Sequence, residues 1–280
     1  MLHFGYDGQR LAYNIYGDGP HTTVLMPALL LSQKMQVPLA RSLAARGNRV
    51  VTFDPLGHGD SDRPRDMWRY GMPEFAKQAV ALLDHLELEQ AIVGGTSLGA
   101  NITLEVASLA PARLRGMILE MPVLDNAIPA CAAAFTPLLF ALTFGEPVMR
   151  AIALGARAVP QRGLPFLVGM WLDCLAQAPG PSGALLQGII FSRTAPHRTE
   201  RRTFTAPAIV IGHPRDPVHP FSDADMLASE LPHGRLIDAD SIIELRLNPE
   251  RLTTQIAEFV DDCWRAPAVA PARRRRANSG

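Results

Sequence analysis

The sequence predicts an α/β protein with a mostly parallel central sheet flanked by helices. Short apolar runs alternate with helical patterns over residues 1–123, and the alternation resumes at residue 208. Between these parts lies a long stretch without any strand-like run. Strands that alternate with helices indicate a parallel sheet with right-handed crossovers. The 280 residues, 48% of them hydrophobic, suffice for one large domain that carries an insertion.

The predicted strands are short apolar runs, and each is followed or preceded by a helical pattern. The strands cover residues 11–16, 22–26, 49–53, 91–93 and 117–121 in the first part, then 208–211 and 235–237 in the second. The helices cover residues 39–46, 73–86 and 97–109, then 221–231 and a closing helix at 249–264. From the strand at 22–26 onward, this order places a helix between successive strands of the first part, as a parallel sheet requires.

The chain divides into four segments. Residues 1–123 form the first part of the α/β core, residues 124–204 a helical cap, and residues 205–265 the second part of the core. The cap is rich in Ala, Leu, Phe and Met and is interrupted by Pro and Gly, so we expect several helices inserted after the sixth strand. Residues 266–280 have no apolar period and are expected to be a disordered basic tail.

Composition excludes several classes of function. Basic and acidic side chains balance at 27 each, and the body without the arginine run at 273–276 is mildly acidic, which is a poor match for nucleic acid. Three scattered cysteines without a CxxC pair predict neither a disulfide framework nor a zinc site. The sequence also has no glycine-rich nucleotide loop, so we expect no metal and no cofactor. The first residues lack a signal-peptide pattern, and the expected location is cytoplasmic.

One segment tests the expectation of a soluble protein. Residues 127–145 contain no charge and are long enough to cross a bilayer. They contain Pro129 and Pro137 and have no flanking cluster of Lys or Arg. We therefore expect a buried or substrate-facing helix and no membrane span.

Ser97 lies in a G-x-S-x-G motif at residues 95–99, directly after an apolar strand and before a helix. A serine in this context sits on a strained strand-to-helix turn, and its neighbours must be small. The turn presents the hydroxyl at a helix N-terminus, where backbone N–H groups favour negative charge. The motif predicts a nucleophilic serine.

Together with two further motifs, this turn resembles the α/β-hydrolase superfamily over nearly the whole chain. Residues 54–64 (DPLGHGDSDRP) are similar to the turn after the family's fourth strand, and residues 212–217 (GHPRDP) to the segment that carries its catalytic acid. The helical insertion lies where the family places its cap. The resemblance implies an α/β-hydrolase fold, with Ser97 as nucleophile and Asp216 as acid.

The family's late histidine has no counterpart here. Its slot after the eighth strand falls near Ile242, and no histidine follows His233. His219, three residues after Asp216, is the better candidate for a displaced base, although it could be a turn histidine. His213 is expected to point away, and Glu244 would be a weaker base for a serine.

The remaining site residues follow from the same resemblance and from the cap. The amide of Leu98 is expected to form the oxyanion hole, with Leu29 as the second donor because Pro27 has no N–H. The alternative is an apolar wall with one donor. The cap residues proposed to bind substrate are apolar and are first of all core candidates. They are Phe135, Phe140, Met170 and Trp171. They favour a bulky, apolar small-molecule substrate.

Two functions remain open. The first is a serine hydrolase that acts on an ester, lactone, thioester or C–C bond and needs a histidine near Ser97. The second is a non-hydrolytic relative, either a binding protein or a lyase or cyclase without an acyl-enzyme, and the missing late histidine favours it. Haloalkane or epoxide chemistry needs an aspartate where Ser97 stands. The sequence as a whole favours an enzyme.

Overall fold

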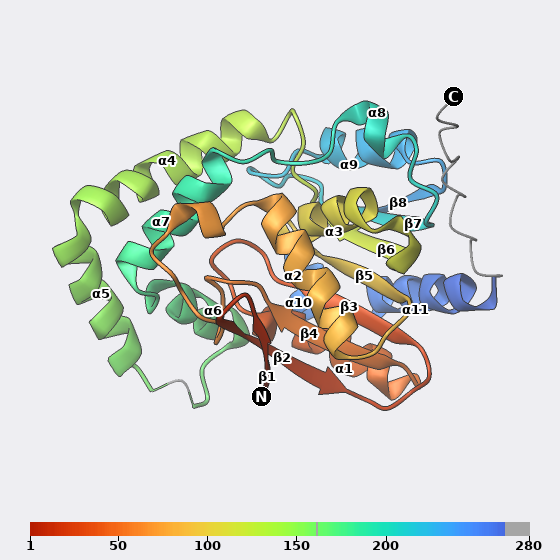
Figure 1. Cartoon of the computed structure of the whole chain (residues 1–280), viewed down its shortest axis with the longest axis horizontal. Coiled ribbons are helices and arrows are strands. Elements are labelled where there is room, and N and C mark those ends of the chain that lie inside the picture. The colour runs from red at the N-terminus through yellow and green to blue at the C-terminus, as the bar shows by residue number, and fades with distance from the viewer. Residues whose placement is uncertain (161, 267–280) are drawn as a thin grey trace, which may run out of the picture.

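A central sheet of eight strands organises the molecule, with helices on both faces (Figure 1). The computed structural model describes residues 1–160 and 162–266. The strand order is β1-β2-β4-β3-β5-β6-β7-β8. The strands are β1 (Leu2–Tyr6), β2 (Gln9–Tyr16), β3 (Thr22–Met26), β4 (Arg49–Asp54), β5 (Ala91–Thr96), β6 (Leu114–Glu120), β7 (Ala208–Gly212) and β8 (Gly234–Asp238). The pairings of β2 with β1 and with β4 are antiparallel and the other five are parallel, which confirms the predicted mostly parallel α/β fold.

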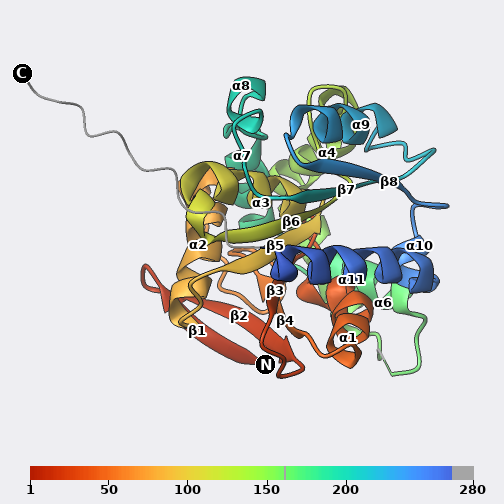
Figure 2. The same cartoon turned by 90° about the vertical axis from the view of Figure 1, so that its right-hand side faces the viewer.

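Helices cover the two faces of the sheet and create two layers of core (Figure 2). One layer packs α2 (Met72–His85), α3 (Leu98–Leu109) and α9 (Phe221–Glu230) on the sheet. The other packs α1 (Val37–Ala45), α10 (Glu244–Leu247) and α11 (Glu250–Arg265). Strands β3 to β7 are buried almost throughout, which explains why they are continuous apolar runs rather than alternating ones.

Strand β1 was not predicted, and the ends of the other strands differ from the prediction by a few residues. One such difference is at β5, which continues through two glycines to Thr96, beyond the predicted end at residue 93. Glycine weakens an isolated strand, but β5 pairs with β3 on one side and β6 on the other. A Cβ on Gly94 would lie 2.5 Å from the carbonyl oxygen of Ile118, so the close packing of β5 on β6 requires glycine there.

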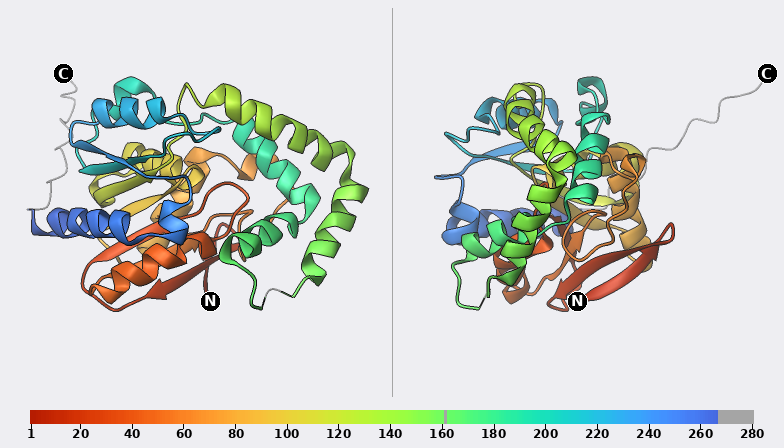
Figure 3. Two further views of the ribbon diagram at one scale, coloured as in Figure 1. Left: turned by 180° about the vertical axis from the view of Figure 1, so that it is seen from behind. Right: turned by 90° about the vertical axis from the view of Figure 1, so that its left-hand side faces the viewer.

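Five helices lie between β6 and β7. The first two lie at the end of the molecule opposite α11, whereas the last lies beside α9, where Arg201 pairs with Glu230 at 2.6 Å (Figures 1 and 3). The five helices are α4 (Ile128–Phe144), α5 (Glu146–Ala158), α6 (Phe166–Leu175), α7 (Pro179–Ile190) and α8 (Arg198–Arg201). Buried Asp223 on α9 fixes the start of this segment, because its carboxylate accepts the amides of Leu124, Asn126 and Ala127. The expected basic tail lies, from residue 267, outside the described residues.

In the part of the chain that the structure describes, no single helix is long and apolar enough to cross a membrane. The helices α4 and α5 satisfy the length and composition criteria only when they are taken together, and they meet at an angle of 100°. The charge-free stretch at 127–145 therefore forms one helix, α4, and the beginning of a sharp bend.

The parallel strands bring distant segments to one edge of the sheet. Thr96 at the end of β5 pairs with Glu120 at the end of β6, and Glu120 pairs with Ile211 near the end of β7. The segments that follow these strands start from the same edge, where α/β proteins generally bind their ligands.

Candidate active site

Ser97 sits on a strained turn between β5 and α3. Its backbone has φ 53° and ψ −105°, a conformation that costs energy for a residue with a side chain. Its neighbours two residues away must be small, because a Cβ on Gly95 or Gly99 would lie 2.5 or 2.6 Å from the carbonyl oxygen of Met26. The structure thus has the strand–turn–helix geometry that presents the serine hydroxyl at the sheet edge.

The structure brings Ser97, His219 and Asp216 together. The Nε2 atom of His219 lies 2.9 Å from Oγ of Ser97, and its Nδ1 atom lies 3.0 Å from Oδ2 of Asp216. An ionised carboxylate can only accept, so Nδ1 carries the proton and Nε2 is free to accept from the serine. This is the arrangement of nucleophile, base and orienting acid, with the histidine on the loop after β7.

The turn that carries the acid and the histidine is locally fixed. The other oxygen of Asp216, Oδ1, accepts the amides of Val218 at 2.8 Å and of His219 at 3.0 Å. Burial disfavours the charged carboxylate, but the imidazole and these two amides outweigh it and lower the pKa of Asp216. Asp216 and His219 each precede a proline, which restricts both residues to extended backbone. One short turn therefore holds both groups.

Backbone amides that could bind an oxyanion lie beside Ser97. Leu98 and Leu29 line the same cavity as the serine. Among the described residues neither amide donates a hydrogen bond, which leaves both available to a ligand. The loop that carries Leu29 is anchored by buried Gln36, whose Nε2 donates to the carbonyl of Met26 at 2.7 Å and to Oγ1 of Thr96 at 3.0 Å.

A cavity of about 250 Å³ opens at Ser97. Its lining comes from α3, from the inner face of α4 and from α7, and no charged side chain contributes to it. Beyond Ser97, Leu98 and Leu29, the lining residues are Met72, Asn101, Val123, Ile128, Cys131, Ala132, Phe135, Thr136, Leu186, Ile189, Ile190 and Thr194. The cavity is therefore predominantly apolar, with a few neutral polar groups.

Of the four predicted substrate-binding residues, one lines the cavity and three do not. Phe135 lines the cavity, whereas Phe140 and Trp171 are 58% and 68% exposed and lie outside it. Met170 is also absent from its lining. The side chains of α4 that face the cavity recur at helical spacing from Ile128 to Thr136, and Phe140 lies beyond that row. The correction has a simple cause: α4 and α6 are apolar around most of their circumference, so composition does not reveal which face is inward.

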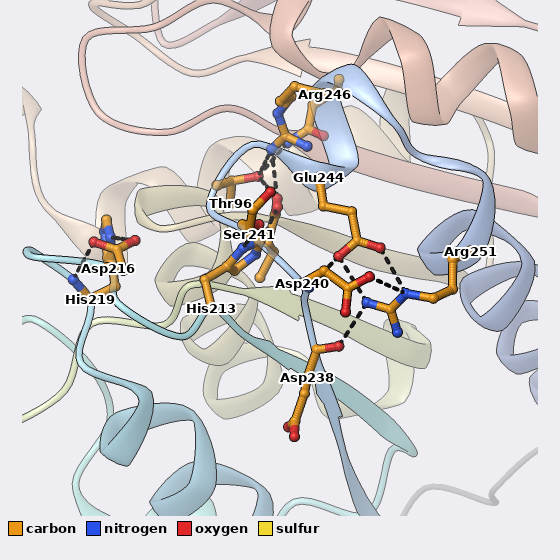
Figure 4. Close-up of polar contacts among 12 residues, drawn as sticks. Thr96, His213, Asp216, His219, Asp238, Asp240, Ser241, Glu244, Arg246 and Arg251 are labelled. Carbon is orange, nitrogen blue, oxygen red and sulfur yellow. Dashed lines mark hydrogen bonds and ion pairs between the residues drawn. The ribbon is translucent and has the colours of Figure 1, made fainter.

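A buried ionic cluster lies behind Ser97, on the side of the strand ends (Figure 4). Arg246 from α10 donates through Nη2 to Oε2 of Glu120 at 2.6 Å and to Oγ1 of Thr96 at 2.7 Å. Thr96 also donates to Glu120, and the carbonyl of Glu120 accepts the amide of Ser97 at 2.8 Å. Arg246 and His213 outweigh burial and lower the pKa of Glu120. The cluster thus joins α10 to the strands that end beside the serine.

His213 belongs to this cluster and not to the serine. Its Nδ1 donates to the carbonyl of Ser241 at 2.8 Å, and its Nε2 lies 3.3 Å from Oε1 of Glu120. Burial disfavours its charged form, but Glu120 outweighs that effect and raises the pKa of His213. His213 therefore points away from the nucleophile.

The segment after β8 does not supply a base. Ile242, at the slot of the family's histidine, is 45% exposed and does not line the cavity. Glu244 is engaged by Arg251, whose Nε and Nη2 donate to its two oxygens at 2.9 and 2.8 Å. Figure 4 separates Asp216 and His219 on one side from Glu244 and Arg251 on the other.

Several residues of the site escaped the sequence analysis. Asn101 on α3 donates to the carbonyls of Val123 and Thr194 and accepts the amide of Val123. It therefore ties both ends of the helical segment to the helix that begins at Ser97. The sequence signal that could have identified Asn101 is its position, a polar residue one helical turn after Ser97. No cluster of metal-ligating side chains occurs in residues 1–160 and 162–266.

Comparisons with known proteins indicate the same fold. The family model for the alpha/beta hydrolase fold matches residues 24–142. The 2-hydroxymuconate semialdehyde hydrolase of Pseudomonas sp. (strain CF600) is 35% identical over 105 residues, 38% of this chain and 34% of that protein. Mouse (Mus musculus) serine hydrolase BPHL is 34% identical over 115 residues, 40% of each chain. The matched segments thus span well under half of these relatives.

The likeness in fold extends much further than the likeness in sequence. The crystal structure of the enol-lactonase from Burkholderia xenovorans LB400 superposes with a TM-score of 0.76 at 21% identity, over 93% of this chain and all of that one. The curated relatives named above are hydrolases. The chain therefore has the α/β-hydrolase fold, and the match to the family model covers residues 24–142.

Proposed function

We propose that the protein is a serine hydrolase that cleaves an ester, lactone, thioester or C–C bond of an apolar small molecule, with His219 as its base. The single observation that carries the proposal is the distance of 2.9 Å between Nε2 of His219 and Oγ of Ser97, with Asp216 on the other ring nitrogen. A protein that only binds its ligand does not need a serine, a histidine and a carboxylate hydrogen-bonded in series at a strained turn.

The reaction follows from the positions of these groups. Oγ of Ser97 attacks the substrate carbonyl as its proton passes to Nε2 of His219, and the carbonyl oxygen becomes an oxyanion between the amides of Leu98 and Leu29. His219 then gives the proton to the leaving group, which departs and leaves an acyl-enzyme. Water, deprotonated by the same imidazole, releases the acid and restores the serine. Asp216 holds the ring and stabilises its charged form.

The cavity supports an uncharged, largely apolar acyl group. It contains no Lys, Arg, Asp or Glu, so a charged substrate group would enter without a partner. Asn101, Thr136 and Thr194 offer neutral hydrogen-bonding groups for one or two polar atoms. Neutral acyl chains should therefore be hydrolysed in preference to carboxylated ones of the same length.

Reaction with a fluorophosphonate probe tests the proposal directly. We expect covalent labelling at Ser97, located by peptide mass spectrometry, and complete loss of labelling and of ester hydrolysis in Ser97→Ala. Ser229→Ala, which removes an exposed hydroxyl on α9, is the matched control and should label normally. A folded protein that neither labels nor hydrolyses any ester would favour the non-hydrolytic alternative.

A further inference from the structure

Large apolar side chains are exposed mainly on the helical segment between β6 and β7. Among the described residues, 12 of the 19 exposed large hydrophobic side chains lie in residues 124–204. They are Ile128, Phe140, Phe144, Val148, Ile152, Leu154, Val159, Val168, Trp171, Leu175, Ile190 and Phe191. Single exposed apolar residues are ordinary, but a concentration of this kind marks a surface that contacts something apolar.

Helix α5 shows the pattern most clearly, because it is apolar on its outer side. Val148, Ile152 and Val159 recur at spacings of four and seven and are 65%, 43% and 40% exposed. Its buried residues are the small Ala153 and Ala156. A surface helix in water normally has the opposite arrangement, with large apolar side chains inside and polar ones outside.

The neighbouring helices continue this surface. Phe140 and Phe144 on α4 stack on each other with ring centroids 5.7 Å apart, and Phe144 is 78% exposed. On α6, Trp171 is 68% exposed. Figures 1 and 3 show α4 and α5 as the outermost helices at the end of the molecule opposite α11. We call Phe140, Phe144, Val148, Ile152 and Trp171 the outer apolar surface.

Cations outnumber carboxylates on and around the outer apolar surface. Residues 125–173 contain three arginines and three carboxylates, and Arg65 and Lys34 add two cations, which pair with Glu146 and Asp173. Glu146 is held by Arg150 at 2.8 Å and by Arg65 at 3.4 Å. Arg157 donates through Nε to the carbonyl of Ala176 at 2.8 Å, a contact that leaves its positive charge uncompensated. Apolar side chains with an exposed tryptophan, flanked by more cations than carboxylates, match the interface of an anionic bilayer.

From these observations we propose that the outer apolar surface binds the surface of an anionic lipid bilayer. The helices lie on the membrane and do not cross it, because α4 lines the cavity with its inner face and packs on α7. A second copy of the chain fits less well, since a two-fold interface would place the arginines of one copy near those of the other. The inference does not depend on the proposed hydrolysis.

Vesicle flotation with the full chain tests the proposal. Binding to vesicles of phosphatidylcholine and phosphatidylglycerol in equal parts should exceed binding to phosphatidylcholine alone and should fall at high salt. The combined variant Phe144→Ser, Val148→Ser and Ile152→Ser should bind at least about tenfold more weakly. Arg157→Gln should lose about fivefold on anionic vesicles. Leu109→Ser, an exposed apolar residue at the end of α3, is the matched control and should bind normally.

A second measurement does not rely on these variants. Brominated lipid should quench the tryptophan fluorescence of the wild type, and Trp171→Phe, which keeps an aromatic ring, should lose most of that quenching. No flotation with either vesicle, or equal flotation of the serine variant, would overturn the proposal. A concentration-dependent dimer that the serine variant abolishes, without vesicle binding, would assign the surface to a second copy and also overturn it.

Discussion

The segments after β7 and after β8 leave the same edge of the sheet but carry different chemistry. The segment after β7 aims Asp216 and His219 at Ser97, whereas the segment after β8 sends Arg246 into the protein behind the serine. In the family that the sequence resembles, the second segment would bring the histidine. Here the first segment supplies the imidazole of His219. The second segment supplies the buried guanidinium group of Arg246, which binds Glu120 and Thr96 beside the turn that carries Ser97.

The difference teaches that one active-site geometry can be reached by two routes. What a serine requires is an imidazole nitrogen within hydrogen-bond distance and a carboxylate on the other nitrogen, whatever segment supplies them. Because Asp216 binds the backbone amides of Val218 and His219, its turn folds back far enough for His219 to reach the serine. A base three residues from its acid is therefore sterically possible.

The largest expected effect is on the first segment. His219→Ala should lower the turnover of any ester substrate by about 10²–10⁴-fold, as loss of a general base does. His213→Asn, which removes the other imidazole of the same loop while keeping a donor toward Ser241, should retain most activity. The comparison is made on kcat/KM with both variants checked for folding by circular dichroism. Equal activity of the two variants would remove the distinction between the histidines.

The second segment should matter for stability. Arg246→Met removes the guanidinium group that contacts buried Glu120 and should lower the free energy of unfolding by about 3 kcal/mol. Arg251→Met, which breaks the more exposed pair with Glu244, is the control from the same region and should cost less than about 1 kcal/mol. Urea denaturation measures both. Similar losses of unfolding free energy in the two variants would mean that burial does not strengthen the contribution of the Arg246–Glu120 pair to stability.

The buried cluster also predicts a dependence of stability on pH. Contact with Glu120 raises the pKa of His213 despite its burial, and Arg246 opposes this rise. Its contribution is therefore complete below the ordinary histidine pKa of about 6.5 and is lost as the pH rises through the higher folded value. Unfolding curves from pH 6 to pH 9 should show wild type losing stability relative to His213→Asn. Parallel curves would contradict a charged His213.

The smallest effect on kcat/KM is expected at Ile242, the position at which the family has its histidine. Ile242→His places an imidazole where the family has one, but Ile242 is exposed and outside the cavity, and His219 already contacts the serine. As a surface substitution it should change kcat/KM by no more than about twofold. A gain of tenfold or more would show that the second segment can still reach Ser97.

The sequence predicted the fold and the polar residues of the site better than the apolar ones. The alternation of strands and helices and the serine turn are local patterns, and the carboxyl ends of parallel strands necessarily meet at one edge. The contact between Arg246 and Glu120 spans 126 residues, and nothing near Arg246 indicates burial of its charge. The predictions that Phe140 and Trp171 line the cavity were wrong, because the sequence of a helix that is apolar on several sides does not show which side faces inward.

The turn at residues 216–219 has a consequence for how the site tolerates change. Asp216 and His219 stand at the two ends of a four-residue turn. Each precedes a proline, and the amides of Val218 and His219 both bind the carboxylate of Asp216. Their mutual geometry is thus a property of one local unit, independent of the register of β8 or the length of the loop behind it. Insertions and substitutions between β8 and α10 should therefore leave Asp216 and His219 together. What that stretch must still preserve is the Ser241 carbonyl that binds His213 and the position of Arg246 on α10.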